Sequence, residues 1–196
     1  MNKVSSLFPS ATNMIRVDHT HVLSTFHQYK PEAPLRVRQA LVNTICTALE
    51  IHAQLEEEIF YPAVRQAVGT ELIGENLEEH QEMKRLIALL RRMEPSARDY
   101  DQTLMTLMRD VIHHVADEET IVLPAAELQL AGELSDLGLQ MTKRRLQLVA
   151  PRAGQIAKDM AWAASGNKLL MGLGALGLLG AIVLAASRPR TSHYLD

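Results

Sequence analysis

Two short segments of the sequence carry the same pattern of residues that can bind a metal ion. One runs from His52 to Pro62 and the other from His114 to Pro124, and each begins with His-x-x-x-Glu followed by a second glutamate. On an α-helix, residues four apart lie on the same face, so each histidine and its first glutamate can reach one point. A neutral imidazole and a carboxylate are ligands of transition metals. The repeat therefore predicts a metal site.

Two further histidines lie on the apolar stripes of two other predicted helices, which gives one such histidine to each of four helices. These groups are costly to bury without a partner, and a shared cation removes that cost. The predicted metal ligands are His19, His52, Glu56, His80, His114 and Glu118.

The elements that must position these side chains are helices. Apolar residues recur three and four apart, and no alternation typical of a strand has useful length. Prolines and glycines divide the chain before Gly132 into four helical segments, which we expect at about 12–29, 35–69, 73–95 and 96–124. Their short connections predict an all-α, up-down-up-down four-helix bundle with a C-terminal helical extension. Pro62 and Pro124 are expected to kink or fray their helices.

The C-terminal part of the chain differs in character from the bundle. We expect an N-terminal arm, a metal-binding bundle, a helical connector, a transmembrane helix and a tail, at residues 1–11, 12–130, 131–167, 168–188 and 189–196. Residues 169–187 carry no charge, and a helix of this length spans roughly 29 Å, close to the about 30 Å of a bilayer core. We therefore expect a membrane-anchored protein.

The orientation and assembly of this anchored chain also follow from the sequence. The N-terminus lacks the apolar run of a secretory signal, so the metal domain is expected in the cytoplasm. Gly177, Ala181 and Ala185 form a row of small residues, a pattern that favours a homo-oligomer through this helix.

Composition and missing motifs exclude several classes of function. The net charge of −3 gives no electrostatic case for a nucleic-acid partner, and the single Cys46 excludes an internal disulfide. The sequence has neither the Glu-x-x-His pairs of ferritin-like proteins nor the His-Glu-x-x-His of zinc hydrolases. Six ligands without a thiolate are too many for structural zinc. The ligand types suit iron and leave manganese or zinc open.

The pattern resembles the hemerythrin HHE cation-binding family over about residues 12–128. The resemblance rests on Asp18-His19, His52-x-x-x-Glu56 before Phe60-Tyr61-Pro62, Glu79-His80, and His114-x-x-x-Glu118 before Leu123-Pro124. It implies an oxo- or hydroxo-bridged di-iron centre inside the bundle, in which both glutamates bridge the irons. Oxygen-carrying hemerythrins have two histidines four apart in the third helix, whereas Asn76 and Lys84 flank His80 at that spacing here. A fifth histidine is therefore missing, replaced by water or supplied from elsewhere.

The resemblance implies a non-haem di-iron protein that binds or senses dioxygen or another small diatomic ligand such as nitric oxide. The alternatives are a di-iron oxidoreductase acting on peroxide or nitric oxide, and an iron-binding or storage protein. We favour the binding protein over the enzyme. Of the remaining groups, His113 is expected at the surface, about 100° around the helix from His114. Glu57 and Glu119 are either partners of ligand imidazoles or solvated.

Overall fold

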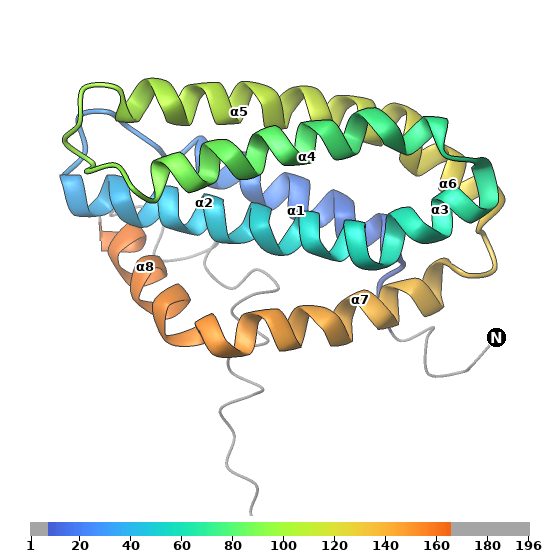
Figure 1. The fold of residues 1–196 in the computed structure, drawn as a ribbon. Helices are drawn as coiled ribbons and strands as arrows, with labels where there is room; N and C mark the ends of the chain where they lie inside the picture. The colour runs from blue at the N-terminus through green and yellow to red at the C-terminus, as the bar shows by residue number, and fades with distance from the viewer. Residues whose placement is uncertain (1–7, 166–196) are drawn as a thin grey trace, which may run out of the picture.

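The computed structural model describes residues 8–165, and every regular element among them is a helix. The all-helical class expected from the sequence is therefore confirmed. Four long helical segments form a bundle with short connections (Figure 1). They are α1 (Ala11–Phe26); α2 (Leu35–Leu55), which continues through η2 (Glu56–Phe60) into α3 (Tyr61–Val68); α4 (Glu71–Leu90); and α5 (Tyr100–Asp117), which continues through η3 (Glu118–Val122) into α6 (Leu123–Gln129).

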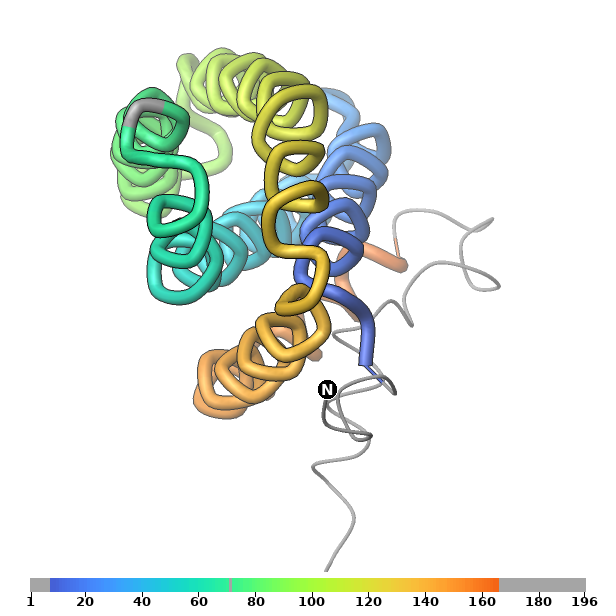
Figure 2. The backbone as a smooth tube through the Cα atoms, turned by 90° about the vertical axis from the view of Figure 1, so that its right-hand side faces the viewer, coloured from blue at the N-terminus to red at the C-terminus, as the bar shows by residue number. Residues whose placement is uncertain are grey.

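The four segments enclose a common interior. Helix α1 packs against α2 and α5, and α4 packs against the same two helices. Figure 2, which looks along the bundle, shows these helices arranged around one central space. Side chains that point inward from all four helices can therefore meet at one level.

Prolines, glycine and short turns set the helix ends. The Ser10 side chain accepts a hydrogen bond from the backbone N–H of Asn13 at 3.3 Å and so caps α1. Pro34 precedes α2, and Gly69, with a φ of 106°, ends α3 in a conformation that glycine adopts at low cost. Helix α1 is shorter than expected because a turn, in which Tyr29 N–H donates to the carbonyl of Phe26, replaces its last residues.

The two internal prolines do not fray their helices. Each follows a π-helical turn, in which the N–H of Tyr61 donates to the carbonyl of Glu56 and the N–H of Leu123 to that of Glu118. Proline lacks an N–H and clashes with the carbonyl four residues earlier, and a wider turn before it moves that carbonyl out of the α-helical register. Both π turns begin at a glutamate of the predicted metal site.

The apolar core is divided into two clusters by a polar level across the bundle. One cluster contains Ile15, Leu55, Phe60 and Leu123, and the other contains Ile45. In every helix of the bundle, the histidine of the predicted site lies between residues of the two clusters. The metal-binding groups are therefore surrounded by apolar packing on both sides, which excludes bulk water from them.

After α6 the chain turns back and packs along the outside of the bundle. This extension consists of α7 (Leu134–Val149), η4 (Ala150–Arg152) and α8 (Ala153–Ser165). Helix α7 contacts α1 and α2, and α8 contacts α2 (Figure 1). Leu137 and Met141 join one of the two apolar clusters. The extension is thus packed against the metal-binding bundle.

The expected transmembrane helix and membrane anchoring require a correction. No helix in residues 8–165 is long and apolar enough to cross a membrane. Helix α7 contains Arg144 and Arg145, and the 13 residues of α8 would span only about 20 Å of a hydrocarbon core of about 30 Å. The segment 168–188 and the row Gly177, Ala181 and Ala185 lie outside the described residues. This finding contradicts the expected membrane-anchored localisation.

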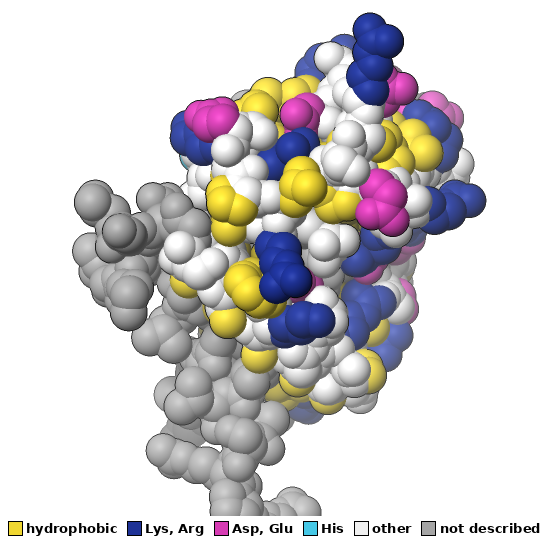
Figure 3. All heavy atoms as spheres, turned by 90° about the vertical axis from the view of Figure 1, so that its left-hand side faces the viewer, with side chains coloured by type: hydrophobic (Ala, Val, Ile, Leu, Met, Phe, Trp, Pro, Cys, Tyr) yellow, Lys and Arg dark blue, Asp and Glu magenta, His cyan; other side chains and the backbone are white. Residues whose placement is uncertain are grey.

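At the end of the bundle that faces the reader in Figure 3, the surface carries charges of both signs. Lysine and arginine side chains are interspersed there with aspartate, glutamate and small apolar areas. Such a mixed surface agrees with the small net charge of −3 and offers no continuous basic stripe for a phosphate backbone on this face.

Candidate metal centre

All six predicted side chains are buried at one level of the bundle. None of them is more than 4% exposed. Ligand atoms of one group, formed by His19, His52, Glu56 and Glu118, all lie within 4.8 Å of one another. Those of a second group, formed by Glu56, His80 and His114, meet the same criterion. The structure therefore brings together residues from four different helices, and Glu56 belongs to both groups.

Each glutamate lies between two histidines, one from the pair His19 and His52 and the other from the pair His80 and His114. Glu56 Oε2 is 3.3 Å from the Nε2 of His52 and 3.3 Å from that of His80. Glu118 Oε2 is 3.1 Å from the Nε2 of His19 and 3.9 Å from that of His114. Two carboxylates, each close to one histidine of either pair, form an arrangement whose ligand types suit a metal ion.

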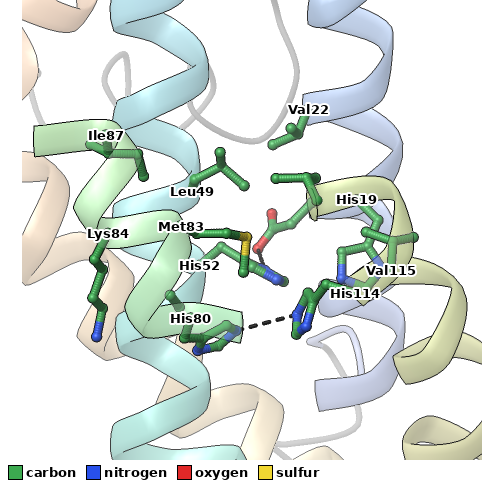
Figure 4. A pocket seen from close by; sticks show the side chains of 13 residues that line it. His19, Val22, Leu49, His52, His80, Met83, Lys84, Ile87, His114 and Val115 are labelled. Atoms are coloured by element: carbon green, nitrogen blue, oxygen red, sulfur yellow. Dashed lines mark hydrogen bonds and ion pairs between the residues drawn. The ribbon is translucent and has the colours of Figure 1, made fainter. Parts of the chain in front are cut away.

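The histidines face one another across a small space (Figure 4). The Nε2 atoms of His80 and His114 are 3.2 Å apart, and the rings of His19 and His52 have centroids 4.9 Å apart. Imidazole nitrogens that converge in this way share a ligand or a proton, because two lone pairs repel at such a distance.

Several of these atoms have no hydrogen-bond partner within the described residues. They include the Nε2 atoms of His19 and His52, Oε1 of Glu56 and Oε2 of Glu118. The 3.1 Å approach of His19 to Glu118 is close, but it lacks the geometry of a hydrogen bond. A buried polar atom without a partner costs free energy, and a cation would supply a partner to all four. The donor set therefore fits a metal ion.

Every histidine of the centre also faces a carboxylate with its other nitrogen. The Nδ1 atoms of His19, His80 and His114 lie 2.8, 2.9 and 2.9 Å from carboxylate oxygens, and that of His52 lies 3.5 Å from one. The respective carboxylates belong to Glu119, Glu57, Glu79 and Asp18. A carboxylate accepts the Nδ1 proton, so the Nε2 lone pair points into the centre.

These outer carboxylates were only partly foreseen from the sequence. Glu57 and Glu119 act as partners of imidazoles rather than as solvated groups. No role was predicted from the sequence for Glu79 or Asp18, although each stands directly before a histidine of the site. That position was the available signal, but each binds a histidine on another helix. His113 lies outside the centre, with 71% of its side chain exposed.

The residues four positions before and after His80 are Asn76 and Lys84, and both side chains form hydrogen bonds with groups other than the six predicted ligands. Lys84 Nζ donates to both carboxylate oxygens of Glu57, at 2.7 and 2.5 Å. Asn76 Nδ2 donates to the carbonyl of Leu72 at 3.2 Å. Helix α4 therefore brings one histidine to the centre, together with the Glu79 that orients His114.

Tyr61 adds a hydroxyl group that the ligand pattern did not include. Its oxygen lies 3.1 Å from Glu118 Oε1 and 3.4 Å from Glu56 Oε2. The π turn positions it, because a turn closed between residues i and i+5 brings Tyr61 over Glu56. In the second copy the same position is Leu123. Burial and the negative charges of both glutamates raise the pKa of Tyr61 well above its usual value, so it remains a donor.

Two histidines of the metal-free centre bind protons tightly. Burial alone would lower the pKa of His19, but its contacts with Glu118 and the charge of Glu56 raise it to about 9. For His80 the contacts with Glu56 and Glu57 likewise outweigh burial and raise the pKa to about 9. Burial lowers the pKa of His114. At neutral pH, His19 and His80 are therefore protonated whenever no cation is bound.

Metal uptake is accordingly expected to release protons. An imidazole must be neutral to bind a metal, so binding at pH 7 displaces up to two protons, one from His19 and one from His80. Because both folded-state pKa values lie above the usual 6.5, these protons stabilise the metal-free fold below about pH 6.5. That contribution is lost as the pH rises through about 9, and metal affinity rises over the same range. A titration of the protein with metal in weak buffer, followed with a pH indicator, measures the release of protons. Metal uptake without proton release would contradict the protonation of His19 and His80 in the metal-free protein.

A small apolar cavity adjoins the four imidazoles. Its lining outside the histidines includes Val22, Leu49, Met83, Ile87, Val111 and Val115, several of which are labelled in Figure 4. The cavity leaves about 10 Å³ for the centre of a water-sized molecule, which is room for about one water. The space beside the imidazoles is therefore about the size of one water molecule.

Comparisons with known proteins agree with this geometry. The model of the hemerythrin HHE cation binding domain matches residues 10–126. An uncharacterized protein of Mycobacterium tuberculosis is 31% identical over 144 residues, which is 71% of this chain and 87% of that protein. A DNA nickase of Nostoc is 31% identical over 124 residues, and the match spans 63% of this chain but only 35% of the nickase.

A solved structure shares the fold. The crystal structure of a hemerythrin HHE cation binding domain-containing protein from Mycobacterium kansasii has a TM-score of 0.65 and 24% sequence identity. The likeness covers 81% of this chain and 99% of that one.

Proposed function

Because this chain belongs to the hemerythrin HHE cation-binding domain family, we propose that its buried histidines and glutamates hold two iron ions which bind a small diatomic molecule. His19 and His52 would hold one iron and His80 and His114 the other. Glu56 and Glu118 would be shared between them. An iron pair supplies electrons and open coordination positions to such a ligand.

The observation that carries this proposal is the cavity beside the imidazoles. It is lined by all four histidines, its other walls are mainly aliphatic apart from Asp18 and Lys84, and it has room for about one water-sized molecule. Dioxygen and nitric oxide are small and uncharged, so they enter an apolar space without loss of hydration. An ion or a larger organic substrate would lose hydration or clash with Leu49, Met83 and Ile87.

The protein supplies preorganised surroundings for the bound ligand. Three imidazoles are oriented by a hydrogen bond between Nδ1 and a carboxylate, which keeps the ring in one tautomer, and the Nδ1 of His52 faces Asp18 at 3.5 Å. The valine, leucine and isoleucine side chains give the cavity beside the imidazoles a largely apolar wall. These features suit a protein that binds or senses its ligand rather than one that turns over a bulky substrate.

Tyr61 favours an oxidoreductase acting on peroxide as a second candidate. Its hydroxyl donates to Glu118 Oε1 at 3.1 Å, and so a proton lies next to a shared carboxylate. Cleavage of the O–O bond of peroxide takes up two electrons and two protons. A bound iron pair would supply the electrons, and a second peroxide would restore them as it is oxidised to dioxygen. A buried hydroxyl donor next to the shared carboxylate would assist the proton transfers, which simple binding does not need.

Metal analysis and absorption spectroscopy of the full chain test the proposal. We expect two irons per chain after aerobic purification, and a visible spectrum that changes on reduction and again on addition of air or nitric oxide. Iron well below two per chain without ligand-to-metal bands would overturn the di-iron centre.

Peroxide consumption separates the two candidate functions. For the enzyme, we expect steady consumption that falls at least tenfold in Tyr61→Phe at unchanged iron content, a loss within the usual effect of a proton donor of about 10²–10⁴-fold. Tyr100→Phe is the matched control, because Tyr100 is equally buried but lies in the other apolar cluster. If the protein only binds its ligand, neither the unmodified chain nor the Tyr61→Phe variant consumes peroxide steadily.

A further inference from the structure

Helix α7 delivers a buried arginine to the edge of the metal centre. Arg145 is 4% exposed, although it carries a charge, and it lies beyond the residues 10–126 that match the family. Its Nη1 donates to Asp18 Oδ1 at 2.7 Å, and its Nη2 donates to Asp18 Oδ2. This two-point contact fixes the plane of the carboxylate as well as its position.

Asp18 is the carboxylate that faces His52. Its Oδ2 lies 3.5 Å from the Nδ1 of His52, whereas the other three histidines have their carboxylates at 2.8 to 2.9 Å. No buried cation in residues 8–165 holds those three carboxylates: Glu57 pairs with Lys84, whose side chain is 45% exposed. The orientation of His52 thus depends on a residue outside the bundle, unlike that of its three counterparts.

We propose that Arg145 is a positioning residue of the metal centre, which acts through Asp18 on His52 and so makes helix α7 part of one metal position. The inference rests on the proposed function, because it assumes that His52 binds an ion. It assigns the extension a role at the position formed by His19 and His52. At the position formed by His80 and His114, the partners Glu57 and Glu79 come from the bundle itself, and no side chain of α7 is paired with either carboxylate among the described residues.

The close approach of α7 to the start of α1 makes this contact possible. A Cβ added at Gly138 would lie 2.1 Å from the carbonyl oxygen of Pro9 and 3.0 Å from the backbone nitrogen of Ala11. Both neighbours are backbone atoms, so even alanine at this position must push α7 away from α1. Gly138 and Arg145 are seven residues apart and therefore lie on the same face of the helix. The glycine thus allows the approach that brings the guanidinium to Asp18.

Loss of Arg145 is expected to weaken one metal position and spare the other. Without the guanidinium, Asp18 loses the two hydrogen bonds that fix the plane of its carboxylate, and His52 loses an oriented partner for its Nδ1. Loss of such an outer partner costs about 10–100-fold in metal affinity. In Arg145→Met, one of the two irons should therefore be removed at a correspondingly lower concentration of chelator, and the other should be removed as in the unmodified chain.

Anaerobic competition between the iron(II)-loaded full chain and a ferrous chelator measures each iron separately. Arg144→Met is the matched control: Arg144 is the neighbouring residue on α7, its side chain is 34% exposed, and its partners Glu58 and Gln147 are neither predicted ligands nor partners of a ligand imidazole. Arg145→Lys keeps the buried charge balanced but cannot hold both oxygens of Asp18, so it should fold and lose part of the affinity. Asp18→Asn and Gly138→Ala should weaken the same iron.

Three outcomes would overturn the inference. Equal weakening of both irons in Arg145→Met would show a general loosening of the bundle, which a melting curve would reveal as well. Unchanged release of both irons in Arg145→Met and Arg145→Lys would show that His52 needs no help from α7. An unmodified chain that does not bind two irons would overturn the proposed function, and this inference with it, before any variant is compared.

Discussion

The His80→Ala variant is expected to bind iron at least about 100-fold more weakly than the unmodified chain, since loss of even an outer partner costs about 10–100-fold. His80 is fully buried, and its Nε2 lies 3.3 Å from Glu56 and 3.2 Å from the Nε2 of His114. Alanine leaves one histidine at this metal position. Iron content after gel filtration and the intensity of the ligand-to-metal bands measure the loss.

His113→Ala is the matched control for this variant. His113 is a neighbour of the ligand His114 in sequence, but its side chain is 71% exposed and its Nε2 lies 3.5 Å from Asp117. Its removal leaves all six groups of the centre unchanged, so iron content should stay the same. Equal losses in the two variants would show that the ligand assignment on these helices is wrong.

Removal of the metal is expected to lower the thermal stability of the fold markedly. The centre places two carboxylates and four imidazoles in the interior, and several of their atoms have no partner among the described residues. A ligand present at 1,000 times its dissociation constant stabilises the folded state by about 4 kcal/mol per site. For a chain of this size, about 4 kcal/mol corresponds to a shift in Tm of roughly 8–16 °C.

Circular dichroism melting curves with and without a chelator measure this difference. A double variant, Glu56→Leu with Glu118→Leu, provides the control, because it removes both shared carboxylates and should not respond to the chelator. Coincident melting curves for the loaded and the chelated protein would contradict the idea that the buried cluster requires a cation.

The sequence alone determined the residues that meet at the centre. The spacing His52 to Glu56, and its repeat at His114 to Glu118, places each pair on one helical face, because the geometry of an α-helix is local and periodic. The apolar stripes show which face is buried. The all-helical class follows from the same periodicity, the family was identified by the resemblance of the motifs, and both are shown.

The expected membrane helix and membrane anchoring were wrong. Length and lack of charge in residues 169–187 were the whole basis of that expectation. In the part of the chain that the structure describes, the C-terminal helices α7 and α8 are charged, short and packed on the bundle, and no helix there is suited to cross a membrane.

Only the tertiary structure decided which carboxylate orients which histidine. Glu79 precedes His80 but binds His114, and Asp18 precedes His19 but faces His52. These pairings depend on the rotation and axial register of neighbouring helices, which are set by side-chain packing between segments far apart in the sequence.

The same dependence on distant contacts applies to Tyr61 and Arg145. Tyr61 reaches the shared carboxylates because a π turn adds a residue before Pro62. Arg145 reaches Asp18 because Gly138 allows α7 to lie against the start of α1. Local periodicity therefore determined which histidines and glutamates meet at the centre, and long-range packing determined which groups contact them from outside.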